Sequence, residues 1–219
     1  MKIKDFTKVG KQLLPELPGF VQEKNLIFRS PITDIFYGFC FGGSRFDPNC
    51  FYFSVLFLPL FVLRQDKGMP LTFGKDIRNA LNWTKDNPRL LADLHAAVRD
   101  EGLPFLNSVL TLPEAIRYMK AKVEFDRPRV NSHILEALAC TLIKSGDYPS
   151  ALKALAEFKQ LFRQPTYAWE LKQGARINLI EEKLLEDPGA AVAQLDAWKA
   201  ETARNLELEE FLEPSVKGD

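Results

Sequence analysis

The side chains that could do chemistry in this sequence are few and scattered. The chain has 219 residues, two histidines and three cysteines. A thiol nucleophile needs a base beside it, and a metal site needs closely spaced ligands. His95 and His133 stand in separate segments without an H-E-x-x-H or E-x-x-H pattern, and no C-x-x-C pair occurs. The sequence therefore predicts no metal site and no cofactor.

A catalytic site assembled from single residues stays open as an alternative. The segment 42–45, Gly-Gly-Ser-Arg, lacks the spacing of a phosphate loop, so a plain turn between strands is favoured over a small anion nest. Cys40 stands among aromatic residues, where burial would keep its thiol neutral. If the chain is an enzyme, the candidates near the predicted strands are Cys40, Arg45, Asp47 and His95.

Composition argues against two large classes of partner. Lys plus Arg and Asp plus Glu both total 29, so the net charge is zero, which disfavours a nucleic-acid-binding domain. The most apolar run, 51–63, is interrupted by Pro59 and is shorter than the roughly 20 residues of a membrane helix. The chain starts without a secretory signal pattern, and its odd number of cysteines indicates reduced thiols. We expect a cytoplasmic protein.

One local cluster of positive charge surrounds a predicted break at 127–129. An exposed cluster of this kind can steer association with an acidic partner surface. We therefore expect the partner-binding residues to include Arg117, Lys120, Arg127 and Arg129.

The elements that must position these residues divide by composition. Eleven of the 17 phenylalanines lie between positions 20 and 73, and after Gly74 the sequence is charged, with Ala and Leu at helical spacing. This segregation predicts an α+β fold: an N-terminal helix, an antiparallel β-meander of three or four strands, then a mostly helical C-terminal half of about six helices. The expected strands are 20–29, 32–41 and 50–62, and the expected later helices are 76–83, 88–102, 112–123, 132–144, 148–162, 169–185 and 190–208.

The strand 32–41 has one bulky face and one small face. Its small face carries Gly38 and Cys40, and we expect a helix to approach there. The domain organisation expected from composition is a helix plus sheet in 1–73, a helical cover of the sheet in 74–127, and helical hairpins in 128–219, which could also form one continuous domain.

Residues 132–162 resemble one tetratricopeptide unit. Apolar residues at helical spacing precede and follow Gly146-Asp147-Tyr148, although no second copy follows at the expected period of about 34 residues. More of the chain resembles uncharacterised bacterial families through Pro18-Gly19-Phe20, the segment 103–106 (Leu-Pro-Phe-Leu) and Leu195-x-x-Trp198. Some members of such families are regarded as immunity partners of secreted toxins, which implies a protein-binding role.

These features are compatible with three functions. The first is a non-enzymatic, cytoplasmic protein-binding module, such as a bacterial immunity or adaptor protein, that acts by occlusion or scaffolding through the late helical hairpins. The second is an enzyme built on the four candidates named above. The third is a structural homodimer joined through the aromatic sheet. The expected partner is another protein or a second copy of the chain, with neither nucleic acid nor membrane.

Overall fold

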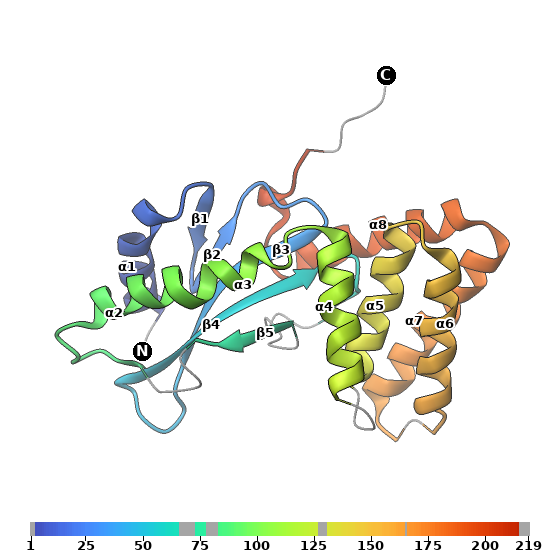
Figure 1. Cartoon of the computed structure of the whole chain (residues 1–219), viewed down its shortest axis with the longest axis horizontal. Helices are drawn as coiled ribbons and strands as arrows, with labels where there is room; N and C mark the ends of the chain where they lie inside the picture. The colour runs from blue at the N-terminus through green and yellow to red at the C-terminus, as the bar shows by residue number, and fades with distance from the viewer. Residues whose placement is uncertain (1–2, 66–72, 78–82, 127–130, 165, 215–219) are drawn as a thin grey trace. The chain divides into compact units, whose positions relative to one another are not determined.

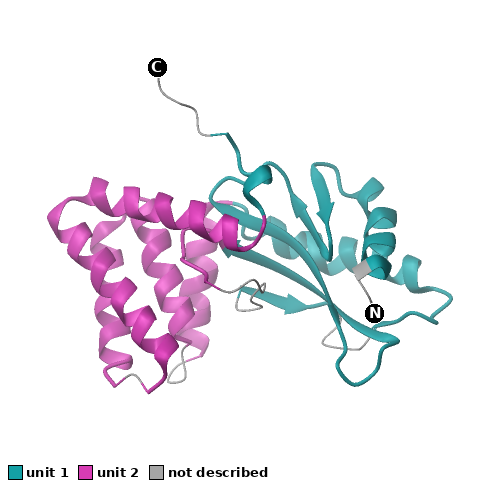
Figure 2. Cartoon of the chain, turned by 180° about the vertical axis from the view of Figure 1, so that it is seen from behind, with its two compact units in different colours: residues 1–58, 68–110, 208–219 teal, residues 59–67, 111–207 magenta. Residues whose placement is uncertain are grey.

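The structure, a computed structural model, describes residues 3–65, 73–77, 83–126, 131–164 and 166–214 (Figure 1). The chain forms two compact units, each built from separate stretches (Figure 2). Unit 1 comprises 1–58, 68–110 and 208–219, and unit 2 comprises 59–67 and 111–207. The fold is α+β, as the sequence predicts: an N-terminal helix and an antiparallel sheet come first, followed by a mostly helical C-terminal half.

Among the residues that the structure describes, unit 1 is organised around a sheet of six strands, more than the three or four expected. Strands β1 to β5 follow one another across the sheet in chain order, so the predicted meander is confirmed, and β6 pairs with β4. The central strands are almost wholly buried, because both of their faces carry large apolar side chains. The strands are β1 (Phe20–Glu23), β2 (Leu26–Arg29), β3 (Ile35–Gly43), β4 (Cys50–Pro59), β5 (Gly74–Asp76) and β6 (Trp83–Thr84).

The single strand expected over 20–29 is wrong, because the chain turns at Lys24 and Asn25 to form the β1–β2 hairpin. Lys24 adopts a φ of 53°, and the Asn25 side chain donates to the carbonyl oxygen of Phe41 at 2.7 Å. The turn falls within the polar stretch 22–25, which separates Phe20 and Val21 from the apolar residues 26–28. The helix expected over 76–83 is also wrong at both ends, since Asp76 closes β5 and Trp83 opens β6, while 78–82 lie outside the described residues.

Helices of unit 1 contact the bulky face of β3, and the short helical turn η4 (Glu209–Phe211) packs on the small face, where Phe211 contacts Phe28, the strand neighbour of Gly38. From α1 (Ile3–Leu13), Phe6 stacks on Phe41 with ring centroids 5.5 Å apart. A Cβ atom on Gly102 would collide with the ring of Phe39, so the glycine that permits close approach lies in the helix. Gly102 does not stop the helical run, which crosses the sheet as α2 (Leu90–Ala97), the π-helical turn η3 (Val98–Gly102) and α3 (Leu103–Asn107) (Figure 1).

Unit 2 is a helical bundle with α5 (Ser132–Lys144) at its centre. Nearly every residue of α5 is buried, which fits a helix that is apolar on all sides, and it packs against α4, α6 and α8. These helices agree with the expected segments to within a few residues. They are α4 (Leu112–Phe125), α6 (Tyr148–Leu161), α7 (Ala168–Glu186) and α8 (Pro188–Asn205).

The turn between α5 and α6 is stabilised by local polar contacts. Gly146 adopts a φ of +81°, which a glycine reaches without strain, and the Asp147 carboxylate accepts the backbone N–H of Ser150 at 3.2 Å to cap α6. The segment 59–65, in which the chain turns after the end of β4, joins the same unit by bonds to α8, where Thr202 and Asn205 contact the backbone of Val62 and Arg64.

Candidate functional site

Cys40, the thiol proposed for an enzymatic alternative, is half-buried on β3. The side-chain amide of Asn25 lies 3.6 Å from its Sγ atom, and the Cys40 thiol faces the carbonyl oxygen of Phe41 at 3.7 Å. Burial, with a smaller contribution from the charge of Asp76, raises the pKa of Cys40 to about 11. The thiol is therefore protonated and a poor nucleophile at neutral pH.

Asp47 lies in the β3–β4 loop and bonds within that loop. Its carboxylate accepts the backbone N–H of Asn49 at 2.8 Å and the thiol of Cys50 at 3.1 Å. These bonds lower the pKa of Asp47, and the same carboxylate raises the pKa of Cys50. Arg45 is exposed in this loop. The structure thus pairs Asp47 with Cys50, a contact that the sequence did not indicate.

His95 lies on α2, where its Nδ1 atom is 2.9 Å from a carboxylate oxygen of Glu16. Across the described part of the chain, no hydrogen bond or ion pair joins Cys40, Asp47 or His95 to one another. Within the same residues, no cluster of three or more His, Cys, Asp and Glu side chains is placed to hold a metal ion. Cys40, Asp47 and His95 therefore have separate local partners, and Arg45 is exposed.

The structure describes only part of the positive cluster predicted around 127–129. Arg117 and Lys120 are exposed on α4, whereas Arg127 and Arg129 lie outside the described residues. Lys120 and its neighbour Lys153 contribute a small lowering of the pKa of Asp147, which is set mainly by bonds to Ser150. The charge of this surface is thus balanced in part by a nearby carboxylate.

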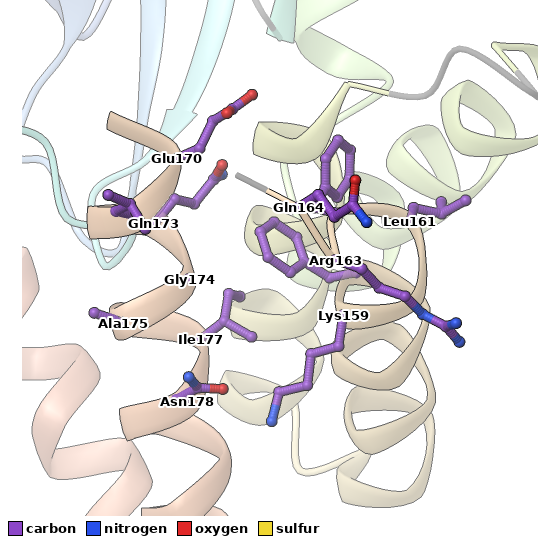
Figure 3. A pocket seen from close by; sticks show the side chains of 13 residues that line it. Lys159, Leu161, Arg163, Gln164, Glu170, Gln173, Gly174, Ala175, Ile177 and Asn178 are labelled. Atoms are coloured by element: carbon purple, nitrogen blue, oxygen red, sulfur yellow. The ribbon is translucent and has the colours of Figure 1, made fainter. Parts of the chain in front are cut away.

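A groove runs between α6 and α7, with a cavity volume of about 830 Å³ (Figure 3). Its apolar lining includes Phe158 and Ile177, both almost fully buried, and the exposed side chains of Leu161 and Leu171. Gly174 lines the groove from α7, and a Cβ atom placed there would meet no atom within 4 Å. The absence of a side chain at position 174 therefore helps to keep the groove open. We call this site the α6–α7 groove.

Three charged side chains line the α6–α7 groove. Lys159 is paired with Glu181. The Glu170 carboxylate accepts the backbone N–H groups of Thr166 at 2.6 Å and Tyr167 at 2.9 Å, so it caps the start of α7. Arg163 is exposed and forms no ion pair with any residue that the structure describes. Arg163 is therefore the one cation of the groove lining that has no ion-pair partner among the described residues.

A buried polar network that sequence reasoning missed lies between α5 and α7. Glu136, on α5, is only 1% exposed, and its carboxylate accepts two bonds from Arg176, at 2.7 and 3.0 Å, and one from Gln173 at 2.7 Å. Burial opposes ionisation of Glu136, but His133, Arg176 and Gln173 outweigh it and lower its pKa. Gln173 also accepts a bond from Ser132 at 2.8 Å. The network joins α5 to α7.

Two signals in the sequence point to these features. Glu136 interrupts the apolar run 134–143, and a carboxylate in such a run needs a buried partner. Gly174 lies inside a helical pattern, where glycine is unfavourable unless space is needed. Within the described residues, no helix is both long and apolar enough to cross a membrane. Comparison with protein-family models, with curated proteins and with solved structures finds no match to this chain.

Proposed function

We propose that this chain is a non-enzymatic protein-binding module that acts by occlusion or scaffolding through the α6–α7 groove. The observation that carries the proposal is an apolar groove lining that is exposed at Leu161 and Leu171 and continues into the buried side chains of Phe158 and Ile177. Leu161 and Leu171 are two of the eight large hydrophobic residues found exposed in the described chain, and both line the groove. Apolar and aromatic side chains gathered on a surface are typical of protein interfaces.

The occupant that fits the groove is a short segment of another protein with apolar side chains flanked by carboxylates. The apolar side chains would pack on Phe158, Leu171 and Ile177, with room left by Gly174. The carboxylates would meet Arg163, the groove cation without an ion-pair partner among the described residues. Such charge complementarity favours an acidic partner and speeds its association.

We place this activity in the cytoplasm, because all three cysteines are free thiols. The role of an immunity or adaptor protein is part of the same proposal and rests on the sequence resemblance. Under it, the partner segment belongs to a protein whose active surface is covered when the groove is filled.

The experiment uses the full chain, tagged in its native cells and purified with whatever binds stoichiometrically. Gly174→Phe fills the groove without contact with neighbouring atoms at its Cβ, and Arg163→Glu reverses the rim charge. Lys153→Glu, an exposed lysine on α6 outside the groove lining, is the matched charge control. The captured partner is then made pure and its affinity for each variant is measured.

The proposal expects binding by the wild type and by Lys153→Glu, and at least about a tenfold loss in both groove variants. It also expects carboxylate-to-lysine changes in the partner segment to restore binding to Arg163→Glu. The proposal is overturned if the partner binds Gly174→Phe as tightly as the wild type. A chain that runs at twice its monomer mass and captures nothing else also overturns it, in favour of the homodimer.

A further inference from the structure

A second pocket lies on the other flank of α7, with a cavity volume of about 680 Å³. Its lining includes Arg64, His133, Glu136, Trp169, Lys172 and Arg176, all within unit 2. We call it the Trp169 pocket. The volume falls within the range of roughly 300–1,000 Å³ that small-molecule sites occupy.

One wall of the Trp169 pocket is a set of stacked rings. Trp169 is 48% exposed, and the imidazole of His133 stacks on it with centroids 5.3 Å apart and planes inclined by 26°. Tyr167, 61% exposed, lies 6.4 Å from Trp169 with planes inclined by only 8°. Flat, exposed aromatic surfaces of this kind bind other planar rings by stacking.

The same pocket is rich in positive charge. Lys172 and Arg176 are four residues apart on α7 and Trp169 is three before Lys172, so the three side chains share one helix face. Arg64 adds a third cation, and Glu136 is the one carboxylate in the lining. The lining is therefore net positive, because its three cations outnumber its one carboxylate.

Glu136 orients Arg176 for binding an anion. Two guanidinium N–H groups of Arg176, on Nε and Nη2, donate to the Glu136 carboxylate. A guanidinium has five N–H groups, so three are left for a ligand or water. The Glu136 carboxylate is almost fully buried, and its two bonds hold the guanidinium of Arg176 in one orientation.

We infer that the Trp169 pocket binds a small planar organic anion. Its flat unsaturated ring stacks on Trp169, and its phosphate or carboxylate is held by Lys172 and Arg176. This inference is independent of the α6–α7 groove, because Trp169, Lys172 and Arg176 are absent from the groove lining.

The test is isothermal titration calorimetry of the full chain with probes that separate ring from anion. Nucleoside 5′-monophosphates carry a ring and a phosphate, and anthranilate carries a ring and a carboxylate. Adenosine supplies a ring alone, and inorganic phosphate supplies an anion alone. We expect one of the first two classes to bind with a Kd below about 1 mM, and both single-feature probes to bind at least about tenfold more weakly. The class of probe that binds shows whether the anionic group of the ligand is a phosphate or a carboxylate.

Variants then locate the binding. Trp169→Ala and Lys172→Glu change exposed side chains and should each weaken the binding probe at least about tenfold, while Lys153→Glu should leave it unchanged. Circular dichroism of each variant confirms that its helices are retained. The inference is overturned if no ring-bearing anion binds below about 1 mM, or if binding survives in folded Trp169→Ala and Lys172→Glu proteins.

Discussion

Arg176 on α7 donates to Glu136 on α5 through two parallel contacts, Nε to Oε1 at 2.7 Å and Nη2 to Oε2 at 3.0 Å. The side chain of Glu136 is 1% exposed and that of Arg176 is 15% exposed. Two-point contact fixes the register between the two helices, because a shift of α7 along α5 would break both bonds. The groove and the Trp169 pocket both lie on α7, so this ion pair positions both.

Removal of one partner should therefore cost more than removal of both. Arg176→Met leaves the Glu136 carboxylate buried without its cation, and we expect a loss of about 3–5 kcal/mol in the free energy of unfolding. The double variant Glu136→Leu with Arg176→Met should recover most of that loss, because an apolar pair needs no compensation. Urea unfolding of both proteins measures the difference. An equal loss in the two variants would contradict the role given to the pair.

The stabilising effect of Glu136 should depend on acid pH. Its pKa in the folded chain lies below the ordinary value of 4.5, so its contribution is complete above that value and is lost as the pH falls through the lower folded value. Below about pH 4.5 the wild type should lose stability more steeply than the double variant. If the unfolding free energies of the two proteins fall with the same slope below about pH 4.5, Glu136 is not the cause of the acid-dependent loss of stability.

Two glycine-to-alanine changes should shift the free energy of unfolding in opposite directions. Gly174→Ala places a methyl group in open space on a helix, so it should raise the unfolding free energy by about 0.5–1 kcal/mol. Gly102→Ala drives a Cβ atom against the ring of Phe39 and should lower it by about 1–3 kcal/mol. Thermal denaturation of both proteins separates the two effects. Stabilisation by Gly102→Ala would show that the helical run does not approach Phe39 so closely.

Cys40 should resist alkylation in the native protein. With a pKa raised from 9.0 to about 11, its thiolate fraction at pH 8 is about 100-fold below that of an ordinary cysteine. Iodoacetamide labelling followed by mass spectrometry, with urea-unfolded protein as the reference, measures the ratio. Rapid labelling of native Cys40 at neutral pH would instead favour the enzymatic alternative.

The fold was largely predictable from the sequence, and its exceptions have local causes. The helices of unit 2 were located within a few residues because their apolar spacing and caps agree, as at Asn131 and Asp147. The β1–β2 hairpin was missed because no glycine or proline marks the turn within 20–29, so the polar stretch 22–25 was read as part of one strand. Strand β5 was missed because three residues carry too little pattern to show a period.

The candidate site was much less predictable. Spacing on one helix shows that Trp169, Lys172 and Arg176 share a face, but only the tertiary structure brings Arg64 and His133 beside them. The α6–α7 groove likewise depends on how far apart two helices pack, which is set by Phe158, Ile177 and the missing side chain of Gly174. These distances are properties of pairs of elements, whereas sequence periodicity describes one element at a time.

Photo-crosslinking in native cells tests the central proposal most directly. A photoreactive amino acid replaces Leu171, which is 60% exposed and lines the α6–α7 groove, or Leu185, which is 68% exposed on the same helix and outside the groove lining. The account predicts one partner protein crosslinked from position 171, absent from position 185, and lost when Gly174→Phe is added. Equal crosslinking from both positions, or crosslinking at 171 that persists with Gly174→Phe, would contradict it.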